Sequence, residues 1–585
     1  MTTSNNTGYL AMLRAGRDIT RNAGGQPALR LALLADHAPQ QLATVLKAAV
    51  LEQGFFPELY VADYGTAALD AFDGESALHA WRPEVALYSI AVQKYRERFY
   101  AAQSVEERES LPERYVGEVG AVVDALLERG IAVLLSNFAL PQERLFGNYG
   151  ALTAQSLYGS VLRANLLLAE AVSARRNCQL HDVMYLANSV GAAAFLDERL
   201  WAASKYPCAN PFLPDMARSM ARAVAVRKGK VSKVLVLDLD NTLWGGVIAE
   251  DGMDGIALGG DAYGEAFQQF QRYLLALRDR GYVLAVCSKN DEDIATQVFR
   301  EHPEMLIRLD DISVFVANWN DKGSNLDAIA QRLNLSPDSF IFIDDSAFER
   351  DLVRALMPTV AVPELPDDVA DFCVALERSG LLEASGFTGE DRLRNAKYKE
   401  EAQRASSKLS FGNVDDYLAS LDMRVHCTSF APDDIPRVAQ LMQRSTQFNL
   451  RTQRLSDADC ERLVQRGEVT VAARLKDRFG DYGLIAAVAC QEQDGWLFVS
   501  EFVMSCRVLK RGVEDYLVNH LFAQCAARGL AGIRGEYIAS AKNGMVKDLF
   551  ARLGFERAAH DETGSSWYLQ RADYRPRPTH ITEEA

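Results

Sequence analysis

Two aspartates, Asp238 and Asp240, stand two residues apart directly after the apolar stretch VLVL. At the mouth of a strand this spacing gives the two carboxylates different tasks. Asp238 can attack phosphorus and form an aspartyl phosphate, while Asp240 can protonate the leaving oxygen and then deprotonate water. The string DLDNT therefore predicts phosphoryl transfer through a covalent aspartyl intermediate.

Groups that could hold a phosphate follow at intervals along the chain. Phosphoryl transfer spreads negative charge over the equatorial oxygens, so a site needs hydrogen-bond donors and a fixed cation. Thr242 follows the aspartate pair, and Ser288, Lys289 and Asn290 follow the apolar run YVLAVC. Lys322 lies in NDKG before an expected helix. We expect these five residues to bind the phosphate, with Lys322 as the fixed cation.

A second acidic pair, Asp344 and Asp345, ends the apolar run FIFI. Carboxylate and carbonyl oxygens are the ligands that Mg²⁺ prefers. We therefore expect Mg²⁺ to be held by Asp238, by the backbone carbonyl of Asp240, and by an oxygen of Asp344 or Asp345.

These residues follow four apolar runs, KVLVL, YVLAVCS, DISVFVA and SFIFI, each of which ends in polar residues. Parallel strands with aligned carboxyl ends are the simplest interpretation. Upstream, LRLALLA, PEVALYSI and GIAVLLSNF alternate with helical stretches and predict another α/β domain. Downstream, EVTVAARLKD, GLIAAVAC, GWLFVSEFVMS and GIRGEYIA, with a helix between the last two, predict an α+β domain.

The pattern divides the chain into five segments. We expect an α/β domain at 1–225, a phosphoryl-transfer domain at 226–375, a helical connector at 376–415, an α+β domain at 416–572 and a disordered tail at 573–585. The short stretch between Trp244 and Gly264 leaves room for a glycine-rich flap but not for a large cap domain.

Composition excludes several classes of protein. The formal net charge of -16 argues against nucleic acid as a partner. Nine cysteines without a CxxC pair indicate free thiols in a reducing cytoplasm, and neither a zinc site nor a disulfide framework. No stretch approaches the roughly 18 apolar residues of a membrane span, and no secretion signal is expected.

The four motifs resemble those of the haloacid-dehalogenase (HAD) superfamily. Read at greater length, VLVLDLDNTLWGGVIAEDG, NWNDKGSNL, IDDSAFERDLV, STQFNLRTQR and FVMSCRVLKRGVED resemble the FkbH-like glyceryltransferase/phosphatase family. The resemblance implies a HAD-type Rossmannoid sheet with a minimal cap. It also implies an SGNH/flavodoxin-like α/β domain before that sheet and a GNAT-like α+β acyltransferase domain after it.

The resemblance further implies a function. Proteins of this family take 1,3-bisphosphoglycerate, remove both phosphates and deliver a glyceryl thioester to the phosphopantetheine of an acyl carrier protein in polyketide pathways. The upstream domain has no serine nucleophile after its first strand and no DxxH pair near its end, so we expect a degenerate SGNH-like module.

The third domain should contain the transfer site. Its loop at 507–512 is similar to the turn by which GNAT proteins bind pantetheine pyrophosphate, so we expect the carrier arm to contact Arg507, Val508, Arg511, Gly512, Gln447 and Asn449. A glycine common in this loop of the family is Lys510 here.

A cysteine thiolate can attack an acyl phosphate, expel phosphate and hold the acid as a thioester. Cys506 precedes the loop and is the favoured acyl carrier, with Cys287, beside Ser288, as the rival. Two other functions stay open. One is a HAD phosphatase of a small phosphometabolite fused to an acyl-CoA-dependent N-acetyltransferase, and the other is a non-catalytic carrier-docking protein.

Overall fold

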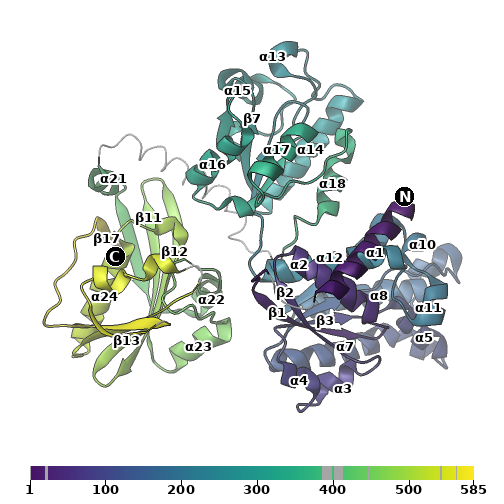
Figure 1. The fold of residues 1–585 in the computed structure, drawn as a ribbon, viewed down its shortest axis with the longest axis horizontal. Helices are drawn as coiled ribbons and strands as arrows, with labels where there is room; N and C mark the ends of the chain where they lie inside the picture. The colour runs from purple at the N-terminus through teal and green to yellow at the C-terminus, as the bar shows by residue number, and fades with distance from the viewer. Residues whose placement is uncertain are drawn as a thin grey trace. The chain divides into compact units, whose positions relative to one another are not determined.

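The computed structural model describes residues 2–19, 24–384, 386, 398, 400, 413–445, 447–540, 543–561 and 563–584. The chain divides into two compact units, Met1–Ser232 with Val374–Phe387 and Lys233–Cys373 with Thr388–Ala585. The first unit holds one sheet, and the second holds two sheets that share no strand (Figure 1). Among the described residues, none of the helices combines the length and the apolar character that a bilayer span needs.

The first unit is built on a five-stranded parallel sheet with the order β2-β1-β3-β4-β5. Its strands are β1 (Ala28–Ala35), β2 (Phe56–Val61), β3 (Val85–Ser89), β4 (Ala132–Ser136) and β5 (Cys178–His181). β3 and β4 are buried at every position because helices cover both faces. This strand order is that of flavodoxin-like doubly wound domains, as expected.

Helices surround this sheet. α1, α2 and α12 pack against one another, and α3 and α7 lie across the sheet from them (Figure 1). The helices are α1 (Thr2–Asp18), α2 (Gln40–Glu52), α3 (Ala67–Phe72), α4 (Ala77–Trp81), α5 (Val92–Ala101), α6 (Val105–Glu109), α7 (Leu111–Glu128), α8 (Leu157–Ser173), α9 (Val183–Val190), α10 (Ala192–Phe195), α11 (Glu198–Ser204) and α12 (Leu213–Arg227).

The second unit begins with a four-stranded parallel sheet of order β8-β7-β6-β9. The strands are β6 (Val234–Leu237), β7 (Val283–Ser288), β8 (Ile312–Ala317) and β9 (Phe340–Ile343), which match the four expected runs. The helices are α13 (Ile248–Asp251), α14 (Ala262–Asp279), α15 (Glu292–Glu301), α16 (Lys322–Leu333) and α17 (Ala347–Leu356). α18 (Phe372–Ser379) begins in this unit and continues into the first. Chain order reverses at β6, so β6 carries its acidic residues to the point where parallel α/β sheets bind ligands.

A small flap follows β6. Single bridges join Asp240 to Trp244 and Gly245 to Ala257, and the one-turn helix α13 lies between them. The expected short flap is therefore present.

The third sheet is mixed, with the order β15-β16-β14-β13-β12-β11-β10-β17. Its strands are β10 (Met423–Thr428), β11 (Val469–Asp477), β12 (Gly480–Gln493), β13 (Trp496–Met504), β14 (Gly532–Ile538), β15 (Glu556–His560), β16 (Gly564–Gln570) and β17 (Ile581–Glu583). The helices are α21 (Val414–Ser420), α22 (Ile435–Arg444), α23 (Asp457–Gln465), α24 (Val513–Ala527) and α25 (Leu549–Arg552). Parallel β13 and β14 inside a mostly antiparallel sheet, with a turn from β13 into α24, fit the GNAT-like expectation.

A short segment occupies a split in this sheet. β13 and β14 pair only over Leu497–Val499 and Ile533–Gly535. Beyond that point the segment 448–450 lies between them. Leu450 N donates to Phe502 O and Met504 N donates to Phe448 O, while Ile538 N donates to Leu450 O. We call residues 448–450 the wedge.

The C-terminal tail and the helical connector were both expected from the sequence. The tail at 573–585 was expected to be disordered, but this is wrong for β17, which pairs in parallel with β10 and buries Ile581. The backbone hydrogen bonds of an edge strand give the tail a place to dock. The expected helical connector begins within α18, and its residues 385, 387–397, 399 and 401–412 lie outside the described residues.

Candidate active site

Asp238 and Asp240 leave the carboxyl end of β6 in a tight turn. Asp238 N donates to Ile343 O at 2.9 Å, which extends the pairing of β6 with β9 by one residue. Asn241 then adopts a left-handed backbone conformation, with φ of 53°, and Thr242 N and Leu243 N donate to Leu239 O. Asparagine tolerates this conformation better than most residues. The turn fixes both carboxylates relative to the sheet.

Lys322 is the cation of the site. It is the first residue of α16, and its side chain is 1% exposed. The ammonium lies 2.7 Å from Asp238 Oδ1 and 3.1 Å from Asp344 Oδ2, and it donates to Cys287 O at 2.8 Å. Burial alone lowers the pKa of Lys322, but the two carboxylates outweigh burial and raise it. Lys322 therefore stays charged.

Asp238, Asp344 and Asp345 form a group whose carboxylate oxygens lie within 4.8 Å of one another. Burial, followed by the charge of Asp238, raises the pKa of both Asp344 and Asp345. Three carboxylates with one ammonium leave an excess of negative charge in a buried place, and a bound divalent cation would neutralise it. The donor set fits Mg²⁺, which takes carboxylate oxygens.

Asp240 turns away from that group into a separate set of donors. Its Oδ1 accepts from Trp244 Nε1 at 2.8 Å and from Ile248 N at 3.1 Å, and its Oδ2 accepts from Asn290 Nδ2 at 3.0 Å. Burial raises the pKa of Asp240 in spite of these donors. A raised pKa favours the protonated form, which is the form that a general acid needs.

The expected phosphate-binding residues converge on the same end of the sheet. Thr242 is buried and exchanges hydrogen bonds with Asp345, through Thr242 Oγ1 to Asp345 Oδ1 at 3.4 Å and Asp345 N to Thr242 Oγ1 at 3.3 Å. Ser288 ends β7 and is 2% exposed. Lys289 Nζ lies 2.6 Å from Glu349 Oε1, and Asn290 contacts Asp240 as described above. The four residues are within one small region.

Cys287 faces the other way. Its side chain is fully buried among core residues such as Val316 and Leu326, and its Sγ lies 3.9 Å from Lys322 O. Burial raises the pKa of the Cys287 thiol to about 12. A nucleophile must be a thiolate that can reach its substrate. These properties argue against Cys287 as the acyl carrier, because strand alternation directs it into the core while Ser288 faces the site.

Two residues of the site were not expected. Trp244 holds Asp240 through its indole, and Arg350 donates to Asp344 O at 2.9 Å and to Asp345 O at 2.6 Å. Arg350 thus fixes the acidic loop from α17. In the sequence, only their spacing could have indicated them: Trp244 is four residues after Asp240, and Arg350 is five residues after Asp345.

The expected carrier loop opens a second region, in the third sheet's domain. Lys510 has a φ of 61° and Gly512 a φ of 77°, so the glycine that is common at position 510 in the family matches a left-handed backbone. A cavity of about 820 Å³ is lined by Phe448, Leu509, Lys510, Gly512 and neighbouring residues. The loop leads into the first turn of α24, where backbone amides can bind an anion.

The two loop arginines contact their own domain. Arg507 Nη2 donates to Tyr482 O at 3.3 Å, and Arg511 contacts the Tyr482 hydroxyl and lies 3.5 Å from Asp477 Oδ2. Arg511 is buried, as is Val508. Arg511 therefore has a structural partner in addition to any anion.

The remaining expected carrier-binding residues differ in exposure. Asn449, in the wedge, is 1% exposed, and its Oδ1 accepts from Arg451 N and Thr452 N. Gln447 is exposed. The Cys506 side chain lies outside the described residues.

Comparisons with known proteins agree with the geometry. The family described as FkbH, N-terminal domain, matches residues 30–225. A crystal structure of the N-terminal part of the protein BF1531 from Bacteroides fragilis, containing a phosphatase domain and complexed with Mg, is 31% identical to the chain, with a TM-score of 0.61. The match covers 65% of this chain and 99% of that one.

Smaller solved structures match the third domain. Ribosomal-protein-S18-alanine N-acetyltransferase from Escherichia coli is 17% identical, with a TM-score of 0.21, over 25% of this chain and 93% of its own. Spermidine N-acetyltransferase from Vibrio cholerae, in complex with CoA and spermine, is 13% identical, with a TM-score of 0.21, over 26% of this chain and 97% of its own. No curated protein matches the chain. The description of this domain therefore rests on its own sheet order and register.

Proposed function

The chain belongs to the FkbH-like family, and from that premise we propose that it is a bifunctional glyceryltransferase/phosphatase. Its substrate is 1,3-bisphosphoglycerate, and its product is a glyceryl thioester on the phosphopantetheine of an acyl carrier protein. The observation that carries the phosphatase half is the group of Asp238, Asp344 and Asp345 around the buried ammonium of Lys322. Burying several carboxylates together is costly, so this arrangement favours a site that binds a cation and a phosphate.

The cofactor is Mg²⁺, held by Asp238, Asp344 or Asp345 and the backbone carbonyl of Asp240. When bound, it would neutralise charge on the phosphoryl oxygens. The BF1531 fragment, whose phosphatase domain was crystallised with Mg, supports this choice. Lys322 would add a fixed positive charge to the same oxygens.

The phosphatase half proceeds in two steps. A carboxylate oxygen of Asp238 attacks the phosphorus of the 3-phosphate, the bond from phosphorus to the substrate oxygen breaks, and Asp240 gives its proton to that oxygen. Asp240 then takes a proton from water, which attacks the aspartyl phosphate and releases inorganic phosphate. Trp244, Ile248 N and Asn290 hold Asp240 in place for both proton transfers.

The transferase half uses the acyl phosphate. A thiolate attacks the carboxyl carbon of the C1 acyl phosphate, the bond to the phosphate oxygen breaks, and a thioester forms as phosphate leaves. We propose Cys506 as this thiol, since Cys287 is buried with a raised pKa. Transfer to the pantetheine thiol of the carrier completes the reaction. The cavity of about 820 Å³ beside Lys510 and Gly512 is the proposed place for the carrier arm.

Intact-mass spectrometry tests the whole proposal. The purified chain is incubated with 1,3-bisphosphoglycerate, Mg²⁺ and a holo acyl carrier protein, and we expect a glyceryl adduct on the carrier. Asp238→Asn should abolish the release of the 3-phosphate and leave a phosphoglyceryl mass on enzyme or carrier. Asp351→Asn, at an exposed ion pair with Arg354, is the matched control and should behave as wild type. Wild-type protein that is folded and yields no acyl adduct would refute the transferase half.

A further inference from the structure

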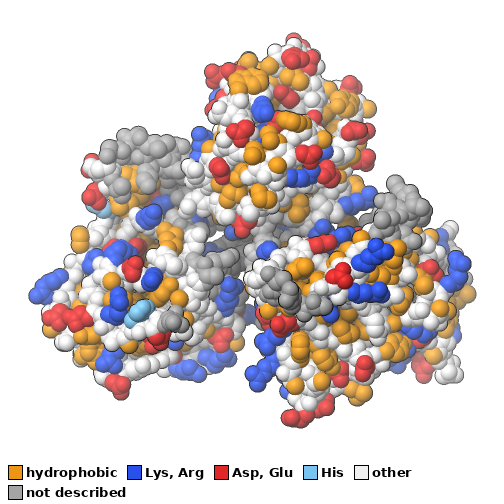
Figure 2. All heavy atoms as spheres, in the orientation of Figure 1, with side chains coloured by type: hydrophobic (Ala, Val, Ile, Leu, Met, Phe, Trp, Pro, Cys, Tyr) orange, Lys and Arg blue, Asp and Glu red, His pale blue; other side chains and the backbone are white. Residues whose placement is uncertain are grey.

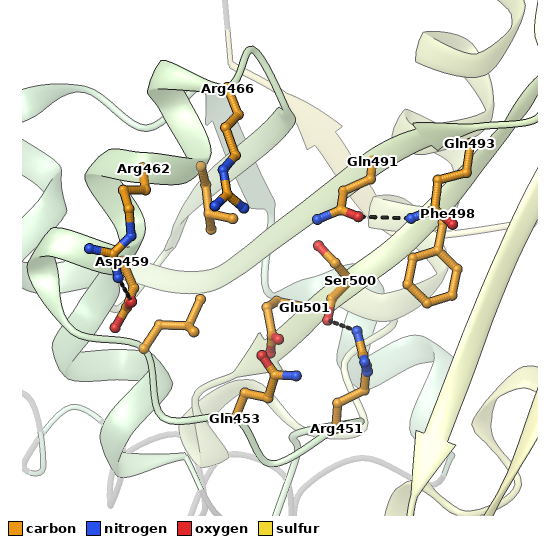
Figure 3. Close-up of a pocket in the computed structure, with 12 residues that line it drawn as sticks. Arg451, Gln453, Asp459, Arg462, Arg466, Gln491, Gln493, Phe498, Ser500 and Glu501 are labelled. Carbon is orange, nitrogen blue, oxygen red and sulfur yellow. Dashed lines mark hydrogen bonds and ion pairs between the residues drawn. The ribbon is translucent and has the colours of Figure 1, made fainter.

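A second cavity, of about 460 Å³, lies in the third sheet's domain, between α23 and the strands β12 and β13 (Figure 3). No residue that lines it belongs to the expected carrier loop. Its polar lining includes Arg451, Arg462, Arg466, Asp459, Ser500 and Glu501. Gln453, Gln491 and Gln493 add three amides to this lining. The cavity is thus rich in hydrogen-bond donors.

The guanidinium groups give the cavity its charge. Arg462 is paired with Asp459 on the same helix. Arg451 donates to Ser500 O at 3.2 Å and lies 3.5 Å from Glu536. Arg451 and Arg466 point into the cavity from opposite sides in Figure 3. Two arginines that face each other across a space suit an anion with several oxygens, because each fork can bind two of them.

Glu501 is the unusual member of the lining. It is 2% exposed, and its Oε2 has no hydrogen-bond partner among the described residues. A buried carboxyl without a partner costs free energy unless a ligand satisfies it. Arg451 lies near enough to influence Glu501, but its guanidinium contacts Ser500 O, Glu536 and the Phe498 ring. These contacts therefore reveal no structural role for Glu501.

A β-bulge turns Glu501 into the cavity. Ala489 pairs with Glu501 and Cys490 pairs with Val499, so Ser500 is an extra residue in β13. In a regular strand, Ser500 and Glu501 would face opposite sides of the sheet. The bulge lets both line the same cavity. Bulges that redirect a side chain in this way are frequent next to binding sites.

We propose that this cavity binds a small phosphorylated carboxylic acid, with the phosphate between Arg451 and Arg466 and with protonated Glu501 donating to an oxygen of the acid group. A cationic ligand would meet the guanidiniums, and an apolar ligand would leave amides and Glu501 without partners. The identity of the natural ligand, the phosphoglyceryl donor, rests on the proposed function. The cavity would then hold the donor in the same domain as the proposed transfer chemistry.

Binding of 3-phosphoglycerate, a stable probe, tests the site by isothermal titration calorimetry on the full-length chain in EDTA. EDTA removes the divalent ion that phosphate binding at Asp238 requires. Arg451→Gln and Arg466→Gln should each weaken binding about tenfold or more, as loss of a charge-assisted hydrogen bond predicts. Arg466 is exposed at the end of α23, so its substitution should not affect folding. Arg528→Gln, at an exposed ion pair with Glu492, is the matched control and should bind as wild type.

Glu501→Gln supplies a second measurement. An amide can donate to the same oxygen as a protonated carboxyl, so affinity should stay within about threefold of wild type. A dissociation constant unchanged in Arg466→Gln, or no binding by folded wild-type protein, would overturn the proposal. Loss of binding in Arg528→Gln as well would indicate a general charge effect and would also overturn it. Failure of the phosphatase proposal would be seen in a different experiment, as release of phosphate that persists in Asp238→Asn.

Discussion

Replacing Lys322 by methionine tests the electrostatic argument for the active site. The change removes the ammonium that lies 2.7 Å from Asp238 and 3.1 Å from Asp344 and keeps most of the side-chain volume. Removing one partner of a buried ion pair leaves an uncompensated charge and typically costs about 3–5 kcal/mol. Part of this penalty should disappear at low pH, because Asp344, whose pKa burial already raises, would take up a proton.

Hydrogen exchange measured by mass spectrometry isolates the effect in one domain of a chain that has several. We expect peptides covering β6 and β7 to exchange at least about a hundredfold faster in Lys322→Met at pH 8, since each tenfold corresponds to about 1.4 kcal/mol of opening free energy. Lys289→Met is the control. Lys289 forms an ion pair with Glu349, but its side chain is 36% exposed, so the loss should stay below about 1 kcal/mol.

Two results would refute the reasoning. One is equal exchange in the Lys322 and Lys289 variants, which would mean that the three carboxylates do not depend on the ammonium. The other is the absence of protection by added Mg²⁺ in both wild type and Lys322→Met. A cation that binds only the folded site stabilises the closed form by mass action, so hydrogen exchange in this domain must become slower.

Three further predictions concern single residues. Trp244→Phe removes a donor to ionised Asp240, so the raised pKa of Asp240 should rise further and the alkaline limb of the phosphatase pH profile should move to higher pH. Burial raises the pKa of Glu501 to about 7. Between about pH 4.5 and pH 7, the folded protein therefore keeps a proton that the unfolded chain has lost. The free energy of unfolding of the wild type falls as the pH rises through this range. Glu501→Gln removes that slope and should be more stable at pH 8 by on the order of 2 kcal/mol, as exchange in β13 peptides would show. Burial lowers the pKa of His181 to about 4, and neither ring nitrogen has a hydrogen-bond partner among the described residues. The first unit should lose stability as pH falls from about 6.5 to 4, and His181→Phe should lower the pH of acid unfolding seen by circular dichroism.

The parallel strands and the acidic site were predictable from the sequence. Three of the four apolar runs of the phosphatase sheet end in or next to Asp238, Ser288 or Asp344, and the carboxyl ends of parallel strands must lie at one edge of a sheet. Asp238, Ser288 and Asp344 therefore had to be neighbours once the strands were recognised. The short flap followed from chain length alone. On the face drawn in Figure 2, basic and acidic side chains are interspersed over the described residues.

Features that depend on tertiary contacts were not predictable. In the sequence, Glu501 is a single acidic residue within an apolar strand. The bulge that directs its side chain into a cavity depends on the pairing of β12 with β13. β17 was missed because a short polar strand forms only where another strand offers free backbone groups. Strand β2 was missed for a similar reason, since its half-buried residues at an edge give a weak apolar signal.

The wedge has a consequence for the integrity of the chain. Its backbone satisfies Phe502 O, Met504 N and Ile538 N, groups that would otherwise face a slot between two diverging strands. An empty slot of this kind accepts an extended segment from another molecule. A proteolytic nick just after residue 450 would free the wedge to leave. The damaged protein should then self-associate by strand exchange, while its phosphatase sheet remains folded.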